Sequence, residues 1–239
     1  MMEIDNIFSK VETCNPVYGC TVNPPCRYCY AREYNEKYGV TPDFSVPKEM
    51  PQALKKIHTK KGKIFFMNSM SDLSSWRVEW RNAVFDEISK YPNNIYTFLT
   101  KRPENIYLDV RSFQNVWMGV TVTNQEDLRR IPTMFENMLA SHYLVCFEPL
   151  HGMIDPFNMS GIDWVIVGGE SPKMNGNKRP GQIMIREEWV DRITEIADRF
   201  RVPVSMKKSL SWKMKERFRQ DIPNEFREYF DLYGSIKER

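Results

Sequence analysis

The chain has 239 residues, of which 41% are hydrophobic and 27% are charged, a balance typical of a folded globular domain rather than a disordered chain. The sequence contains no run of about eighteen uninterrupted apolar residues and no signal peptide, so we expect neither a membrane span nor export. The net charge of +3 neither requires nor excludes a nucleic-acid partner. We therefore expect a single domain over residues 1–239, located in the cytoplasm.

Short apolar runs alternate with amphipathic segments along the chain. Strands are expected at residues 11–14, 63–67, 95–99, 116–122, 143–147, 163–167 and 203–206. Helices are expected from residue 30 and over 80–90, 125–139 (with Asn124 as N-cap and a kink at Pro132), 186–200 and 211–219. This alternation predicts an α/β fold with parallel strands. About six or seven such units favour a complete or partial (β/α) barrel over a Rossmann sheet, whose Gly-x-Gly-x-x-Gly motif is missing.

Three of the five cysteines follow the first expected strand within one short segment. Cys20, Cys26 and Cys29 have the spacing Cys-x5-Cys-x2-Cys. Three thiolates can hold three irons of a [4Fe–4S] cluster and leave the fourth iron open for a small molecule, whereas ferredoxin clusters have all four irons held by the protein. Zinc with a distant fourth ligand such as Cys14, and plain thiols, are the alternatives. We expect Cys14 and Cys146 to be buried small residues.

An aromatic residue, Tyr28, precedes the third cysteine and completes a Cys-x-aromatic-Cys motif. Here the chain resembles the radical S-adenosylmethionine (SAM) superfamily, although the first gap between cysteines is two residues longer than the commonest spacing in that family. The resemblance implies that loop 15–30 holds a [4Fe–4S] cluster, that Tyr28 packs near the SAM adenine and that SAM binds the open iron. It also implies cleavage of SAM to a 5′-deoxyadenosyl radical, with an external one-electron donor of the flavodoxin or ferredoxin type.

Several further blocks resemble, in order, a phage- and mobile-element-associated family of three-cysteine proteins. These blocks are Asn15–Cys20, Cys26–Ala31, Gly119–Gln125, Phe147–Leu150 and Asp163–Ser171. That family is radical-SAM-like and has no assigned reaction, so the resemblance implies a cofactor class and leaves the substrate open.

A nucleoside, nucleotide or nucleic acid is a candidate substrate, because the resembling proteins are phage-associated and segment 207–239 is basic. The same basic residues equally fit the solvated face of a helix. A zinc-binding or iron–sulfur nucleic-acid-binding module without catalysis is the alternative function.

Polar side chains follow the expected strands, at the end where a barrel carries its chemistry. Glu148 is a candidate catalytic residue because a carboxylate directly after an apolar strand is expected to be partly desolvated. Its carboxylate fits a ribose hydroxyl, an ion pair with Arg102 or with Lys207, the second catalytic candidate, or an acid/base role. Residues Thr100–Arg102 and Lys207–Lys208 also fit a carboxylate or phosphate ligand, although Lys208 is expected on the surface.

The candidate cofactor-binding residues at these strand ends are Asn68, Ser69, Asp72, Thr121, Gly169 and Glu170, together with Tyr28. Asn68, Ser69 and Asp72 fit either an ammonium group of SAM or a turn and helix cap. Gly169 allows close approach of the backbone to a ligand, and Glu170 fits a ribose or substrate contact, or a tight turn. The three histidines show no constellation and receive no role.

Overall fold

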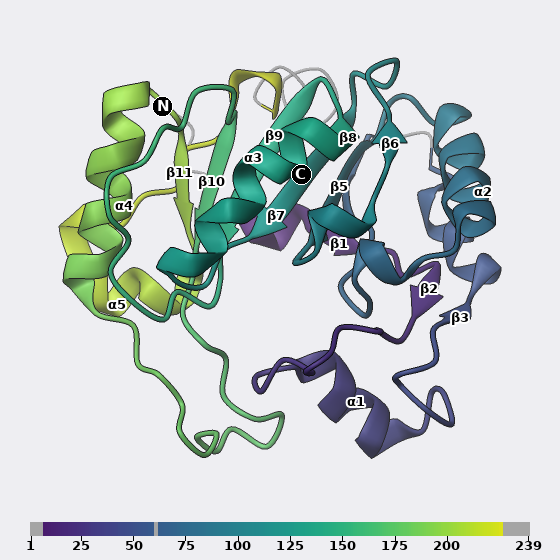
Figure 1. Ribbon diagram of the computed structural model, residues 1–239, viewed down its shortest axis with the longest axis horizontal. Coiled ribbons are helices and arrows are strands. Elements are labelled where there is room, and N and C mark those ends of the chain that lie inside the picture. Colours follow the sequence, from purple (N-terminus) through teal and green to yellow (C-terminus); the bar gives the residue numbers. More distant parts are fainter. Residues whose placement is uncertain (1–6, 60–61, 227–239) are drawn as a thin grey trace, which may run out of the picture.

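The computed structural model describes residues 7–59 and 62–226. Its centre is a curved sheet of seven parallel strands that forms a half-barrel (Figure 1). The strands, in spatial order, are β1 (Val11–Thr13), β4 (Ile64–Phe66), β5 (Ile95–Thr100), β7 (Val116–Thr121), β9 (His142–Phe147), β10 (Trp164–Val167) and β11 (Val204–Met206). Spatial order equals chain order, without the reversal at the centre of a Rossmann sheet. The predicted α/β fold and partial barrel are confirmed.

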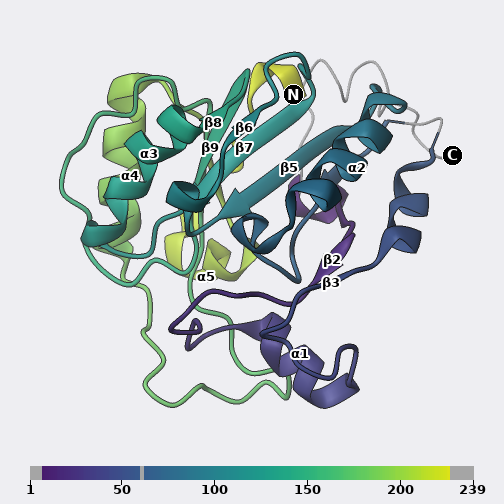
Figure 2. The same cartoon turned by 45° about the vertical axis from the view of Figure 1, so that its right-hand side comes forward.

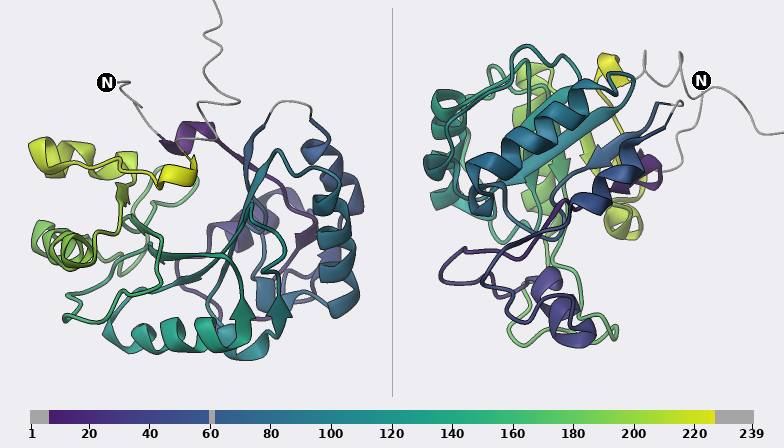
Figure 3. Two further views of the ribbon diagram at one scale, coloured as in Figure 1. Left: turned by 90° about the horizontal axis from the view of Figure 1, so that it is seen from above. Right: turned by 90° about the vertical axis from the view of Figure 1, so that its right-hand side faces the viewer.

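Helices cover the outer face of the half-barrel (Figure 3, left). They are α2 (Val78–Ser89), α3 (Arg130–Asn137) and α4 (Glu187–Phe200), and the short α5 (Ser211–Met214) follows β11. Parallel neighbours need a long connection to return the chain to the starting edge, and the helices provide it.

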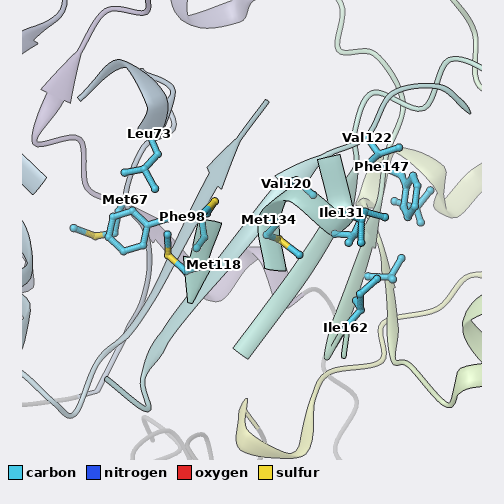
Figure 4. Packing of buried hydrophobic residues seen from close by; sticks show 14 of the residues in the cluster. Met67, Leu73, Phe98, Met118, Val120, Val122, Ile131, Met134, Phe147 and Ile162 are labelled. Carbon is cyan, nitrogen blue, oxygen red and sulfur yellow. The ribbon is translucent and has the colours of Figure 1, made fainter. Parts of the chain in front are cut away.

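The larger hydrophobic core lies between these helices and the outer face of the sheet. It includes Phe98 of β5, Met118 of β7 and Phe147 of β9, together with Ile131 and Met134 of α3 (Figure 4). Side chains alternate between the two faces of a strand, so the next residue along each strand points inward. Because both faces are buried, β7 is buried along its whole length.

The inner face of the half-barrel changes character along the strands. At the end where the strands begin it is aromatic: Phe226 packs against Trp117 and Trp164, with ring centroids 4.8 and 4.9 Å apart, and Phe8 stacks on Trp164. At the end where the strands finish it is polar. The aromatic residues fill the inner face where the strands begin. A ligand on the concave side would therefore bind at the polar end, where the strands finish.

The segment predicted as one helix over 125–139 is divided in the structure. A 3-10 helix over Gln125–Arg129 precedes α3, and the last two residues are extended. Asn124 caps the segment as predicted, because its side-chain oxygen accepts hydrogen bonds from the backbone N–H groups of residues 126 and 127. Pro132 lies in the first turn of α3, just after the change from 3-10 to α-helix, where its missing N–H costs no hydrogen bond within α3.

The predicted helix over 211–219 is also shorter, since α5 gives way to a 3-10 helix over Lys215–Arg217. The other 3-10 helices span Ile7–Lys10, Pro51–Ile57, Leu73–Ser75, Pro103–Asn105 and Lys208–Leu210. Among residues 7–59 and 62–226, no helix has the length and apolarity to cross a membrane.

Two small sheets accompany the half-barrel. Strand β2 (Val17–Tyr18) pairs antiparallel with β3 (Lys48–Glu49), and β6 (Leu108–Asp109) pairs with β8 (Met138–Leu139). Helix α1 (Tyr30–Tyr38) follows β2 and lies below the sheet, beside the long connection between β10 and α4 (Figure 2). This lower layer carries Cys20, Cys26 and Cys29.

Candidate functional site

The cysteine loop, residues 19–29, joins β2 to α1 at the carboxyl ends of the strands. Gly19 has a positive φ of 100° and forms a parallel bridge with Ser71, which follows β4. A Cβ atom at Gly19 would lie 2.9 Å from the Phe44 carbonyl oxygen, so only glycine fits here without displacement. At the other end of the loop, Cys29 is the N-cap of α1 and its sulfur accepts from the Arg32 N–H at 3.4 Å.

The three predicted ligands are free thiols that are neither fully buried nor fully exposed. Cys20 and Cys29 pack against one small apolar cluster of Ala31, Phe44 and Met70. Burial raises the pKa of both thiols, and each interacts electrostatically with the other or with Cys26. Cys29 N–H donates to the Cys26 carbonyl at 3.1 Å, which closes the turn between these two residues.

In the described part of the chain, no three Cys, His, Asp or Glu side chains are gathered closely enough to hold a single metal ion. A [4Fe–4S] cluster places a different demand on its ligands, because each thiolate binds a different iron. Three partly accessible thiols on one loop, beside a partly buried cation described below, fit that donor set. Cys14 and Cys146 are buried, as predicted, and burial raises the pKa of these thiols to about 11 and about 12.

Lys101 is the cation beneath the cysteine loop. It follows β5, and its backbone N–H donates to Asp72 at 2.8 Å. Burial by itself would lower the pKa of Lys101, but Tyr28, Cys26 and Asp72 around the ammonium group raise it above the usual value. Within residues 7–59 and 62–226 this ammonium group has neither a hydrogen bond nor an ion pair. The charge is therefore available to an anionic group bound at the cysteines.

Tyr28 points from the cysteine loop toward the ends of the central strands. Its ring meets the His151 ring edge-on, with centroids 5.2 Å apart and an interplanar angle of 81°. Burial raises the pKa of Tyr28 to about 12, and its hydroxyl interacts with Lys101 and Arg130. Tyr28 thus lies near Lys101 and His151, and its contact with SAM stays a prediction.

The side chains of Asn68, Ser69 and Asp72 are already bonded to protein. Asn68 exchanges two hydrogen bonds with the backbone of Leu99, at 2.5 and 3.0 Å. Ser69 donates to Asn15 at 3.0 Å. Asp72 caps the 3-10 helix over Leu73–Ser75 and accepts from Thr100 at 2.6 Å. These bonds fit the turn-and-cap alternative for all three residues.

Two other predicted residues lie at the strand ends without a defined ligand contact. Thr121 ends β7, is buried, and its carbonyl oxygen accepts from Arg130 at 2.6 Å. Gly169 follows β10, and a Cβ atom there would lie 3.2 Å from the Ile185 side chain. The backbone at Gly169 is therefore close to Ile185, in the segment that leads to α4, whereas the sequence predicted a close approach to a ligand.

Glu170 does not face open space. Its side chain is fully buried, and its two oxygens accept from Arg27 at 2.7 and 3.1 Å. The Nε2 atom of His151 lies 3.1 Å from the same carboxylate. The structure thus joins Glu170 to the cysteine loop.

The two predicted catalytic residues are neighbours on the inner face. The Lys207 ammonium lies 3.3 Å from Glu148 Oε2, so the predicted pair with Lys207 forms and the alternative pair with Arg102 does not. Cys146 Sγ lies 3.9 Å from the same carboxylate oxygen. Gly168 on the strand between them makes room, because a Cβ atom there would lie 2.9 Å from both side chains. About 30% of each side chain is exposed.

Sequence reasoning gave no role to Arg27, considered Lys101 only as part of a basic run and left His151 aside. The partner of Arg27 is 143 positions away, and that of His151 is 19 positions away. No local spacing signals such pairs. His58 and His142 lie elsewhere, beside Glu87 of α2 and stacked on Trp117 respectively.

The predicted basic segment 207–239 lies partly outside the described residues, which end at 226. Within the described part, Arg217 pairs with two carboxylates of α4, and Arg219 pairs with two aspartates. These two guanidinium groups already have anionic partners in the protein.

A family model described as "Protein of unknown function (DUF5131)" matches residues 6–231, which include the whole half-barrel and the cysteine loop. The chain belongs to the DUF5131 family. Neither the curated proteins nor the solved structures gave a match to this DUF5131 chain.

Proposed function

We propose that this protein is a radical SAM enzyme. The observation that carries the proposal is the position of Cys20, Cys26 and Cys29: one loop brings all three to the carboxyl ends of a (β/α) half-barrel, where barrel enzymes carry their chemistry. When bound, a [4Fe–4S] cluster with SAM at its open iron would supply one-electron cleavage of SAM to a 5′-deoxyadenosyl radical.

The residues of the chain have separable roles in this proposal. The three cysteines would hold the cluster, and Tyr28, whose ring contacts His151, would pack near the SAM adenine. Lys101 places a positive charge beside the thiolates and beside any carboxylate bound with them.

The pair formed by Glu148 and Lys207 lies deeper on the inner face and offers both an anion and a cation to a polar substrate. Since each side chain is partly exposed, a substrate with a hydrogen-bonding group can replace one half of the pair. We propose these two residues as the substrate-facing groups. We propose that Thr121, at the end of β7, lines the same polar end of the inner face.

The proposal includes an external one-electron donor of the flavodoxin or ferredoxin type, and a cytoplasmic location that protects the cluster from oxygen. A nucleoside, nucleotide or nucleic acid is the proposed substrate class. The binding module without catalysis is the rival, and the same experiment decides between them.

The experiment uses full-length protein purified without oxygen and reconstituted with iron and sulfide. Dithionite and SAM are added, and 5′-deoxyadenosine is measured by mass spectrometry. We expect brown protein that forms 5′-deoxyadenosine, and we expect Cys29→Ala to lose both the colour and the product. Cys14→Ala is the matched control, because Cys14 is buried away from the loop and should keep both. A colourless zinc protein, or product formation by Cys29→Ala, would refute the proposal.

A further inference from the structure

The second half of the cysteine loop has few backbone anchors. Within the described chain, the backbone of residues 22–28 bonds to other backbone only through the Cys29 N–H and Cys26 carbonyl. The first half is better fixed, because Cys20 N–H donates to Phe44 and Thr21 N–H donates to the Ser75 hydroxyl. Cys29 is anchored through α1, because its carbonyl accepts from the Glu33 N–H at 3.2 Å, so Cys26–Tyr28 depend on side chains for further anchors.

One side-chain anchor is the Arg27 guanidinium group. It binds the Glu170 carboxylate through two nitrogens, and one of these nitrogens also donates to the Pro180 carbonyl at 3.2 Å. Glu170 is fixed in turn by His151 and is fully buried, so it has little freedom to follow a moving loop. A two-pronged bond between a guanidinium and a carboxylate fixes direction as well as distance. Arg27 directly follows Cys26, so this bond fixes a cluster ligand.

A second ion pair joins the same two segments. Arg179 lies 2.6 Å from Glu33 in the first turn of α1, and the Met174 N–H donates to the other Glu33 oxygen at 3.0 Å. Arg179 is itself buried and donates to the Ser171 carbonyl. The segment 170–185, which we name the strap, thus holds the cysteine loop on one side and α1 on the other; Figure 2 shows it beside α1.

We propose that the strap positions the cluster ligands, and that Glu170 acts as a positioning residue through Arg27. This inference rests on the proposed function for its consequence, a cluster held in one geometry, although the positioning itself can be measured without a cluster. It also changes the prediction for Glu170: instead of binding ribose or substrate, its carboxylate fixes the loop that carries Cys26 and Cys29.

The test measures how fast the loop thiols react in metal-free, fully reduced full-length protein. Iodoacetamide labelling of Cys26 and Cys29 is followed by peptide mass spectrometry in wild type, Glu170→Gln, Arg27→Gln and the double variant. Glu187→Gln is the matched control, because Glu187 is a carboxylate whose ion pair is with Arg217, outside the strap and the cysteine loop. Circular dichroism and the thermal midpoint show which variants fold.

We expect each single variant to label about tenfold faster than wild type, because each removes the ion pair that anchors the loop, and Arg27→Gln also leaves the buried Glu170 carboxylate without Arg27. The double variant should label no faster than the faster single variant, since both substitutions remove the same contact. Glu187→Gln should label like wild type. If one single variant does not fold, the double variant, which leaves no unpaired charge, still tests whether the loop becomes more reactive.

Wild-type labelling rates in the folded variants would overturn the inference, and so would single effects that multiply in the double variant. A cluster readout then separates this inference from the proposed function. If wild type binds iron and sulfide, the electron paramagnetic resonance spectrum of the reduced cluster should change in Glu170→Gln and stay unchanged in Glu187→Gln. If wild type binds no cluster, the proposed function fails, while the labelling rates still decide whether the strap positions the loop.

Discussion

The ammonium group of Lys101 lies next to two of the proposed cluster ligands and has no carboxylate paired with it among the described residues. In most protein interiors a charge in that position has a partner. Here the protein leaves the charge available, and the thiolates and a bound carboxylate would supply the compensating negative charge. The site is thus electrostatically arranged for an anionic assembly.

A first prediction follows for Lys101→Met. Reduction of a cluster adds one negative charge, which a nearby, partly buried cation stabilises, and net charge is one determinant of cluster potentials. We expect the reduction equilibrium of the reconstituted cluster to become at least about tenfold less favourable, a decrease of about 59 mV for a one-electron couple. A redox titration followed by absorbance and electron paramagnetic resonance measures this shift.

The controls for this prediction are Lys101→Arg, which keeps the charge, and Lys208→Met, which removes an exposed charge from the neighbouring surface. Both should remain near the wild-type potential. An unchanged potential in Lys101→Met would mean that the ammonium group does not act on the cluster.

A second prediction at the residue scale concerns Cys14, which is buried and donates to the Ala53 carbonyl at 3.3 Å. Burial raises the pKa of this thiol from 9.0 to about 11, so the folded state favours the neutral form. Its contribution is fully present below pH 9 and is lost as the pH rises toward 11, because the unfolded chain ionises first. Urea unfolding of wild type at pH 9 and pH 10 should show this loss. In Cys14→Ala the decrease in unfolding free energy should be smaller by about 1 kcal/mol. Equal slopes in the two proteins would contradict the raised pKa.

At the scale of elements, glycines lie at the inner face where a side chain would collide with residues of the neighbouring strands. One of them makes room for the polar pair at the carboxyl ends of β9 and β11. Gly168, directly after β10, lies between Glu148 and Lys207, and Gly119 of β7 lies between Leu99 of β5 and Leu144 of β9. In both cases the neighbouring strands approach closely, and a side chain from a neighbouring strand occupies the space that a side chain at the glycine would take.

Gly119→Ala tests this packing. Its Cβ atom would lie 2.6 Å from both the side chain and the carbonyl oxygen of Leu144, so β7 or β9 must shift. We expect a loss of about 1–3 kcal/mol in unfolding free energy, measured by urea denaturation. Gly152→Ala is the matched control, since nothing lies within 4 Å of its Cβ position and its φ is not positive. A Gly119→Ala variant as stable as the control would show that the strands are not closely packed there.

At the scale of the whole molecule, a half-barrel leaves its concave face open, and segments outside the sheet must cover it. At the aromatic end this cover consists of Phe8 from before β1 and Phe226 from after the last strand. The two ends of the described chain therefore close the core that the seven strands leave open.

We predict that Phe226→Ala lowers the unfolding free energy by about 3–5 kcal/mol, because the side chain is fully buried against Trp117 and Trp164. The measurement is equilibrium urea denaturation followed by tryptophan fluorescence. Phe200→Ala on α4 is the control, since Phe200 is 39% exposed, and should cost much less. Equal effects would mean that Phe226 does not seal the inner face.

The sequence by itself determined the strand and helix alternation and the order of the units, because apolar periodicity and strand length are local properties. It also determined the three-cysteine loop and the polar strand ends. Element ends were less certain: Pro132 fits the start of a helix as well as a kink, and only the backbone trace distinguishes these. The pair of Glu148 with Lys207 was predictable because all parallel strands of one sheet end at the same edge, including β9 and β11 on either side of β10.

Tertiary structure alone decided which polar residues remain available to a ligand. Asn68 and Asp72 use their oxygens on the adjacent strand, and Glu170 uses both of its oxygens on Arg27 and His151. Such pairings join residues far apart in sequence, so no local pattern encodes them. The strap contacts the cysteine loop only because the connection after β10 reaches across to α1. The chain thus specifies the donor groups locally, whereas the fold decides which of them are free, because hydrogen-bond capacity is used up by whichever partner the packing brings near.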